Sequence, residues 1–227
     1  MNRRFTYSLL SLALALCVSS LPAAAQILND LGPSGNAYDV TNGYTIAGSG
    51  TIGTPYIAAN LFTAGGSGNE SVGQIDLAVG YIINGPFYAS IWTDNNGLPG
   101  TQIANAYWGN PMSNTSFGSC CGLVSVSNIS GVNVTGGQQY FMILGPMDPT
   151  DTSIELWNFN NQGLNGNGEL YSNDGGQSWQ NNGFGPVGAF DILAGRSSGS
   201  TPEPSSLLLF GTGLFGVFAT IRRKLNR

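Results

Sequence analysis

The sequence predicts an all-β protein: a single antiparallel β-sandwich, jelly-roll-like, with an N-terminal signal peptide and a C-terminal single transmembrane helix. Three observations lead to this prediction. Many short segments alternate apolar and polar residues with the period of two that half-buried strands show. Gly and Asn interrupt every window long enough for a helix, and both residues weaken helices. Turn-forming clusters separate the segments at nearly regular intervals, which is typical of sandwiches.

The predicted strands follow one another along residues 43–193. Alternation is clearest at residues 74–79 and 87–92, and a dense turn signal at residues 93–100 precedes the next strand. The segment 139–144 is the most apolar, so we expect it at the centre of a sheet. The full set of predicted strands is 43–47, 56–62, 74–79, 87–92, 102–108, 123–129, 132–134, 139–144, 153–159, 169–172, 177–180 and 188–193.

Both ends of the chain have the pattern of export signals. Arg3 and Arg4 precede an apolar stretch, and small residues lead to a predicted cleavage by signal peptidase between Ala25 and Gln26. At the other end, an apolar run is just long enough to span a bilayer as a helix, and a basic cluster follows it. The predicted parts are a signal peptide (1–25), a β-sandwich domain (26–195), a flexible linker (196–204), a transmembrane helix (205–221) and a basic cytoplasmic tail (222–227).

The C-terminal segment resembles the PEP-CTERM sorting signal of Gram-negative bacteria. The resemblance is carried by the triplet Pro202, Glu203 and Pro204, by the apolar run, and by the basic residues Arg222, Arg223 and Lys224. It implies that an exosortase recognises the triplet region and removes the helix during export. It therefore implies transient anchoring in the inner membrane and a final place in the cell envelope, on the outer surface or in the extracellular matrix.

The charge of the predicted body is one-sided. Residues 26–195 contain eleven Asp and Glu residues and no Lys, Arg or His. Nucleic acid needs cationic side chains that neutralise phosphates, so this composition excludes nucleic-acid binding. The solubility of the body must come from Asn, Gln, Ser, Thr and Gly, a composition common in proteins that live among polysaccharides.

Two features invite a structural or a metal interpretation. Cys120 and Cys121 are adjacent and could form a vicinal disulfide, bridge two chains or stay reduced, but their spacing excludes a zinc site. Asp94, Asp148 and Asp151 are weak candidates for calcium, because Asp and Asn supply oxygen ligands but more often build turns. We expect no cofactor.

The segment 172–179 resembles an Asp-box, the pattern Ser-x-Asp-x-Gly-x-Thr-Trp. Ser172, Asp174, Gly176 and Trp179 match it, and Ser178 replaces the Thr. One copy predicts a stable hairpin and no sialidase activity. Together with the strands and turns from residue 72 to residue 193, it resembles the bacterial choice-of-anchor domains. That resemblance implies a β-sandwich and brings no activity.

The catalytic options are few. Without His or any basic residue, the body cannot hold a Ser-His-Asp triad or a phosphate-handling lysine. Only paired carboxylates remain, as in glycoside hydrolysis, and Asp76, Glu155, Glu169 and Asp191 are candidates by residue type. The GxGxxG at residues 211–216 lies inside the apolar run, so it favours helix packing in lipid over dinucleotide binding.

We therefore predict a surface-sorted protein without catalysis, a structural or adhesive component of the envelope or the extracellular polysaccharide matrix. The alternative is a carbohydrate-binding module or a carboxylate-dependent glycoside hydrolase. A row of exposed Trp and Tyr would favour the alternative, and burial of all four Trp residues (Trp92, Trp108, Trp157 and Trp179) would favour the first prediction.

Overall fold

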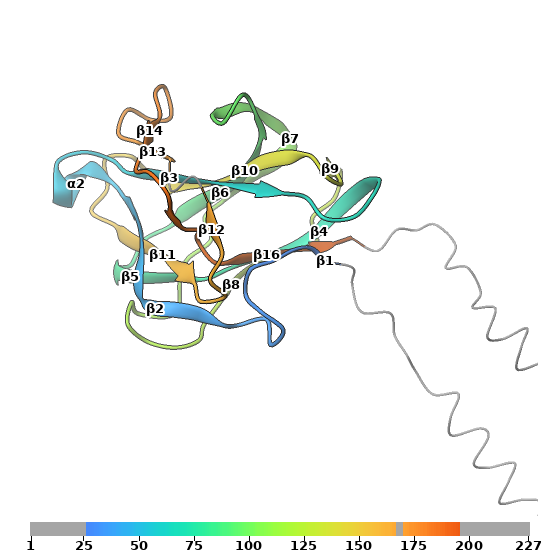
Figure 1. Cartoon of the computed structure of the whole chain (residues 1–227). Coiled ribbons are helices and arrows are strands. Elements are labelled where there is room, and N and C mark those ends of the chain that lie inside the picture. Colours follow the sequence, from blue (N-terminus) through green and yellow to red (C-terminus); the bar gives the residue numbers. More distant parts are fainter. Residues whose placement is uncertain (1–25, 167–169, 196–227) are drawn as a thin grey trace, which may run out of the picture.

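The computed structural model describes residues 26–166 and 170–195, and these residues form strands and one four-residue helix (Figure 1). In chain order the elements are β1 (Gln26–Asn29), β2 (Tyr38–Ala47), α2 (Ser49–Ile52), β3 (Ile57–Thr63), β4 (Asn69–Leu77), β5 (Val79–Ile83), β6 (Phe87–Asp94), β7 (Pro99–Gly109), β8 (Val124–Ser127), β9 (Asn133–Thr135), β10 (Gln139–Pro146), β11 (Ile154–Asn160), β12 (Asn165–Gly166), β13 (Leu170–Ser172), β14 (Gln180–Asn181), β15 (Gly185–Pro186) and β16 (Phe190–Ala194).

The strands form two layers of antiparallel sheet, which confirms the predicted all-β sandwich. One layer is a six-stranded sheet in the order β14-β13-β3-β10-β6-β7. The other layer holds the sheet β1-β16-β4-β8, to which β9 adds by pairing with β4, and the sheet β2-β11-β5 (Figure 1). A small pair, β12 with β15, completes the described strands. The chain crosses repeatedly between layers, since β3 and β4 belong to different sheets.

The main core lies between the two layers. Period-two alternation sends Met142 and Leu144 of β10 inward, where they meet the inward face of β16 with Phe190 and Ile192. The ring of Trp157 is fully buried, with its centroid 5.5 Å from that of Phe190. Full burial of each such side chain stabilises the fold by about 1.5–3 kcal/mol. This core packs the two layers against each other.

A second apolar cluster lies on the opposite, outward side of the six-stranded sheet. It contains Ile57, Ala59, Phe141, Ile143 and Leu170, and half-buried Leu61, Tyr88, Trp92 and Trp179 pack against it. From Tyr140 onwards β10 is buried on both faces, which explains why its sequence is apolar after the exposed Gln139. Strand β10 lies between β3 and β6, which confirms the prediction that it is central.

Several parts of the fold differ from the sequence-based expectation. Of the predicted strand 177–180 only Gln180 lies in a strand, β14, because the backbone N–H groups of Gln177 and Ser178 bond to Asp174 within the turn. Strands β12 and β15 were not predicted. The predicted strand 74–79 is two strands in two sheets, because the chain breaks at Ala78, whose N–H donates to the carbonyl of Ala189. Strand β1 and helix α2 were not predicted, since segments of four residues are too short to show a period. Strand β8 is shorter than the predicted 123–129.

The described part of the chain contains no helix with the length and hydropathy of a membrane span. The predicted helix at residues 205–221 lies outside the described residues, as do the predicted signal peptide and basic tail.

Candidate functional site

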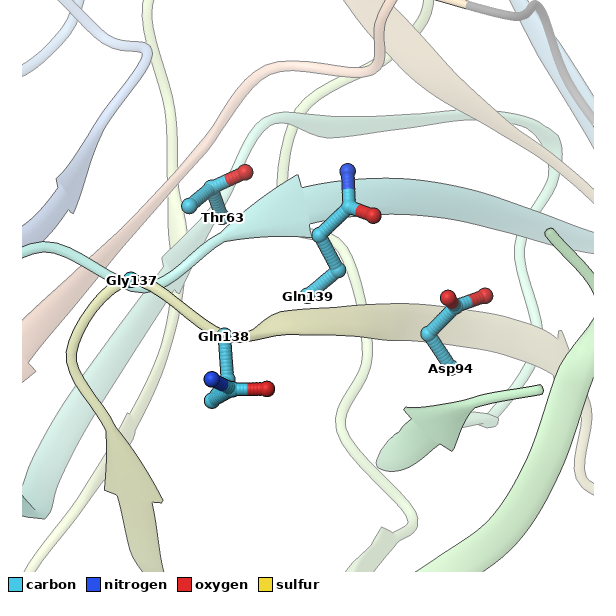
Figure 2. Close-up of a pocket in the computed structure, with 5 residues that line it drawn as sticks. All are labelled: Thr63, Asp94, Gly137, Gln138 and Gln139. Carbon is cyan, nitrogen blue, oxygen red and sulfur yellow. The ribbon is translucent and has the colours of Figure 1, made fainter. Parts of the chain in front are cut away.

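A polar cavity of about 360 Å³ opens at one end of the six-stranded sheet. Thr63, Asp94, Gly137, Gln138 and Gln139 line it (Figure 2). Thr63 ends β3, Asp94 ends β6 and Gln139 begins β10, so three strands that are distant in sequence meet there. Figure 2 shows the side chains of Thr63, Gln139 and Asp94 directed to one side, whereas that of Gln138 is directed to the other.

The turn between β9 and β10 builds one wall of the cavity. Gly137 has a φ of +79°, a conformation that glycine adopts without strain. Its N–H donates to the carbonyl of Ala64 (2.7 Å), and the N–H of Ala64 donates to the carbonyl of Gln138 (2.9 Å). These two bonds fix the turn against the end of β3 and place Gln139 opposite Thr63 in the register.

The polar side chains in the cavity differ in how they are held. Asp94 Oδ1 accepts the N–H of Gly97 (2.7 Å) inside the β6–β7 turn, which fixes its carboxylate. The side chains of Thr63, Gln138 and Gln139 make no hydrogen bond within residues 26–166 and 170–195. An amide carries two donors and an acceptor oxygen, so the cavity offers hydrogen-bonding groups of both kinds together with one negative charge.

The cavity lies at the end of the apolar side of the sheet, which we call the outer face. We define it by the alternate residues that point away from the facing layer: Ile57, Ala59, Leu61 and Thr63 of β3; Gln139, Phe141, Ile143 and Gly145 of β10; Tyr88, Ser90, Trp92 and Asp94 of β6; and Tyr107 of β7. Trp92 lies two residues before Asp94 on the same strand, about 6–7 Å along it. An aromatic ring and a polar cavity are thus direct neighbours.

Aromatic side chains on the outer face are held in fixed positions. Trp92 Nε1 donates to Ser90 Oγ (3.0 Å), so the indole N–H is already satisfied. The rings of Tyr88 and Tyr107 stack with centroids 5.3 Å apart and an interplanar angle of 24°. Burial, with a smaller contribution from Tyr107, raises the pKa of Tyr88. Tyr107 is 44% exposed and presents the accessible ring of this pair.

The four tryptophans fit neither of the two extreme arrangements considered from the sequence. Trp157 is buried in the main core, and Trp108 packs against that core from β7. Trp92 and Trp179 are half-buried on the outer face. Two of the four rings therefore lie where a ligand on the sheet could touch them.

The Asp-box segment forms a hairpin at the β13 edge of the same sheet. Asp174 Oδ1 accepts the N–H groups of Gln177 (3.0 Å) and Ser178 (2.9 Å), and its other oxygen accepts the Ser178 hydroxyl. The Ser178 hydroxyl and N–H, with the other donors, lower the pKa of Asp174 to about 2. Ser172 Oγ accepts the N–H of Gly176 (2.8 Å), and Gly176 has a φ of +86°. The hairpin rises beside the outer face and places Trp179 against it (Figure 1).

The loop that contains the cysteine pair lies against the opposite layer. Cys120 Sγ and Cys121 Sγ are bonded to each other, and both residues are exposed. The N–H of Gly118 donates to the carbonyl of Val40 (2.9 Å) and the Tyr38 hydroxyl donates to the carbonyl of Gly122 (3.0 Å), which tie the loop to β2. The cysteine pair and the cavity belong to different sheets, since β2 is in the three-stranded sheet and the cavity lies at the six-stranded one.

Two of the four candidate catalytic carboxylates are cross-strand neighbours. Asp191 of β16 pairs with Asp76 of β4, and Asp191 Oδ1 accepts the N–H groups of Asp30 (2.8 Å) and Leu31 (3.0 Å). Asp76 is held by the Gln74 amide (2.9 Å) and the Ser125 hydroxyl (2.5 Å). Burial, followed by the charge of Asp191, raises the pKa of Asp30 to about 7. Burial also raises the pKa of Asp191. These carboxylates are used as acceptors for the protein's own groups.

The other two candidates are separate from that pair. Glu155 of β11 is 1% exposed, and its Oε1 accepts the N–H of Gly85 (2.8 Å), while Oε2 has no hydrogen-bond partner. Burial, partly offset by the Gly85 bond and increased by the charge of Asp151, raises the pKa of Glu155 to about 8. Glu169 lies outside the described residues.

The calcium candidates do not come together. Asp94 lies beside the start of β10, whereas Asp148 and Asp151 follow its end. Because eight residues of extended strand span about 25 Å, Asp94 is far from the other two. Asp148 Oδ1 accepts the N–H and hydroxyl of Thr150 (both 2.8 Å), which lower its pKa. No group of three Asp, Glu, Cys or His side chains arranged to hold a metal occurs in residues 26–166 and 170–195.

The comparisons with known proteins identify the C-terminal signal. Residues 200–224 match the family model of the PEP-CTERM protein-sorting motif, which contains Pro202, Glu203 and Pro204. Neither a curated protein nor a solved structure matches the chain. The choice-of-anchor resemblance of the body therefore stays a prediction. The triplet, the basic cluster and Ala25 lie outside the described residues, and Gln26 is the first residue of β1.

Proposed function

We propose, from the premise that this chain is an exported PEP-CTERM protein, that it is a non-catalytic structural or adhesive component of the cell envelope or the extracellular polysaccharide matrix. The motif at residues 200–224 marks the chain for exosortase processing and secretion. The export step thus follows from the motif, and the role at the destination is our proposal.

The observation that carries the proposal is the lining of the cavity. Thr63 brings a hydroxyl, Gln139 brings an amide, and Asp94 is the one carboxylate among the lining residues. General acid–base chemistry on a glycosidic bond needs two carboxyl groups on either side of the bond. A cavity with an amide, a hydroxyl and a single carboxylate is suited to holding a hydroxyl-rich ligand without cleaving it.

The surface chemistry of the body supports the same role. The chain from residue 26 to residue 195 has eleven acidic residues and no basic ones, and Asn, Gln, Ser and Thr supply its other polar groups. Uncharged polar side chains form hydrogen bonds with sugar hydroxyls without the cost of desolvating a charge. The acidic charge also keeps neighbouring copies apart in a dense matrix.

One observation favours the rival, a glycoside hydrolase. Asp76 and Asp191 are directly opposite on adjacent strands, and the raised pKa of Asp191 is what a proton donor requires. Against it, Asp191 is 3% exposed and bonded to two backbone N–H groups, and Asp76 is bonded to Gln74 and Ser125. A substrate would have to displace these partners.

The test is cell fractionation and intact-mass analysis of cells that produce the full chain together with an exosortase. We expect the protein in the envelope or matrix fraction, with a new C-terminus near Pro204. Replacement of Pro202, Glu203 and Pro204 by Ala should keep the whole chain in the inner membrane, and replacement of Ser197, Ser198 and Gly199 by Ala serves as the matched control. Cytosolic protein with both termini intact would refute the proposal, and release of reducing ends from neutral polysaccharide by the purified protein would refute its non-catalytic part.

A further inference from the structure

The outer face combines features that usually occur apart on a protein surface. Half-buried Trp92 and exposed Tyr107 lie on one sheet face, one strand apart, and Asp94, which lines the polar cavity, is two residues from Trp92 on β6. Phe141, the cross-strand neighbour of Trp92, and Ile143 are 1% and 2% exposed, so the rings pack against buried side chains of the neighbouring strand. The β13–β14 hairpin, with Trp179, borders the face on its other side.

We propose that the outer face of the six-stranded sheet is a binding site for a neutral pyranose polysaccharide. In this arrangement the apolar C–H face of one sugar ring packs on Trp92, and hydroxyls of the adjacent sugar form hydrogen bonds with Gln139, Thr63 and Asp94. Tyr107 extends the apolar platform in the other direction. This inference rests on the proposed function and adds the ligand class and the residues that bind it.

The shape of the groups fits such a ligand. A pyranose has a flat apolar side and a rim of hydroxyls, so it needs an aromatic face beside in-plane donors and acceptors. The register supplies this order on adjacent positions: Leu61 and Thr63 on β3, Phe141 and Gln139 on β10, and Trp92 and Asp94 on β6. In each strand the apolar residue belongs to the apolar cluster of the outer face, and the polar residue lines the cavity.

The indole of Trp92, the carboxylate of Asp94 and the backbone of the β9–β10 turn are held in place before a ligand arrives. The bond from Trp92 Nε1 to Ser90 Oγ fixes the indole, and Ser90 is itself 1% exposed. The Gly97 N–H holds Asp94 Oδ1, so the other carboxylate oxygen is available to accept a hydroxyl. The backbone bonds of Gly137 and Ala64 fix the turn that holds Gln139. Groups that are already immobile lose little entropy on binding, which favours affinity for a flexible glycan.

Charge selects the kind of glycan. The described surface carries no Lys, Arg or His, and the cavity holds the Asp94 carboxylate. Uronate-containing or sulfated chains would face repulsion without any cation to pair with them. A second copy of this acidic body would be disfavoured for the same reason. A neutral, hydroxyl-rich chain is the occupant that matches both the platform and the charge.

The experiment measures binding of defined oligosaccharides to the protein recovered from cells that produce the full chain. The probes are cellohexaose, mannohexaose and xylohexaose as neutral chains and an alginate hexamer as the anionic chain, studied by isothermal titration calorimetry. We expect at least one neutral probe to bind and the alginate hexamer not to bind. Trp92→Ala should weaken that binding at least tenfold and Gln139→Ala about fivefold.

Matched controls separate the site from general damage. Tyr81→Ala removes a half-buried aromatic ring from β5 in the opposite layer, and Asn133→Ala removes an exposed amide from β9. Both should bind like the parent protein. If Trp92→Ala does not fold by circular dichroism, Gln139→Ala and Thr63→Val carry the test, because both positions are exposed and neither side chain has a hydrogen bond to lose within the described residues.

Several results would overturn the inference: no neutral probe binds, the alginate hexamer binds more tightly, or Gln139→Ala and Thr63→Val bind like the parent. A dimer that Trp92→Ala dissociates in size-exclusion chromatography would also overturn it, because the face would then be covered by a second copy. Protein that reaches the matrix but binds no neutral probe refutes this inference alone. Protein that binds a neutral probe but stays in the inner membrane refutes the proposed function.

Discussion

The buried carboxyl of Glu155 should make the free energy of unfolding depend on pH, and the structure allows the magnitude of this dependence to be worked out. In the fold its pKa is raised to about 8 from an ordinary value of 4.5, chiefly by burial. The folded protein therefore holds a proton that the unfolded chain releases between these two values. The stability contributed by that proton is complete below about pH 4.5 and is lost as the pH rises to about 8.

The magnitude follows from the width of that window. A difference of one pKa unit corresponds to about 1.4 kcal/mol, so the full window sets an upper bound of about 5 kcal/mol. Partial hydration of the charged form makes the real effect smaller than this bound. We expect the free energy of unfolding to fall by about 2–4 kcal/mol between pH 5 and pH 8.5. Asp30, whose pKa is raised to about 7, adds a slope of the same sign to the parent protein.

Glu155→Gln isolates the contribution of this one group. Gln resembles a protonated Glu in shape, and its oxygen can still accept the N–H of Gly85, so the variant should match the parent within about 1 kcal/mol at pH 5. At pH 8.5 the variant should be the more stable protein by about 2–4 kcal/mol. Urea unfolding followed by tryptophan fluorescence at both pH values measures the difference, since Trp157 is fully buried.

Glu70→Gln is the matched control, because it also removes one negative charge from an acidic body but at a half-buried position. It measures the effect of removing one negative charge from the body, which is then compared with the effect of Glu155→Gln. A stability difference between Glu155→Gln and the parent that is equal at pH 5 and pH 8.5 would refute the reasoning, since it would mean that Glu155 does not hold its proton in the fold.

Three further predictions concern other parts of the fold. Asp174→Asn should speed hydrogen exchange at the amides of Gln177 and Ser178, which bond to this carboxylate. Because the pKa of Asp174 is lowered to about 2, the parent protein should show the same loosening as the pH falls from about 4 towards 2. Unchanged exchange would show that the carboxylate does not hold the hairpin. Gly188→Ala should destabilise the protein by about 1–3 kcal/mol in urea unfolding, because a Cβ there would lie 2.4 Å from Trp157 Cε2 in a packed core; Gly68→Ala, where a Cβ meets open space, is the control that should have a smaller effect. The bonded pair Cys120 and Cys121 predicts no free thiol in the native protein and two after reduction, by alkylation and mass measurement, and free thiols without reductant would contradict it.

Much of the architecture could be predicted because it depends on local patterns. The apolar run at residues 139–144 predicted a central strand, and β10 is central because its two faces meet two apolar clusters. The turn at residues 93–100 and the segment 172–179 form hairpins at those places, since Asp, Asn and Gly satisfy or bend the backbone within a few residues. Local alternation could not show that residues 74–79 divide between two sheets, because the break at Ala78 depends on Ala189.

The carboxylates show the same limit. Residue type alone identified Asp76 and Asp191 as candidates, but it is strand pairing that makes them neighbours. The backbone N–H groups of Asp30 and Leu31, distant in sequence, bond to the Asp191 carboxylate. Glu155 is two residues before Trp157, so its direction towards the core could be inferred from alternation. Its burial could not, since it depends on the chain around Gly85, which is distant in sequence.

The sequence by itself determined that this protein carries an export signal. A sorting signal is read as a short continuous segment, and the triplet, apolar run and basic cluster at residues 200–224 are adjacent along the chain. The tertiary structure decided where a ligand could bind, because Thr63, Asp94 and Gln139 come from three strands and meet only through the register of β3, β10 and β6. An address is a property of neighbours in sequence, whereas a binding site is a property of neighbours in space.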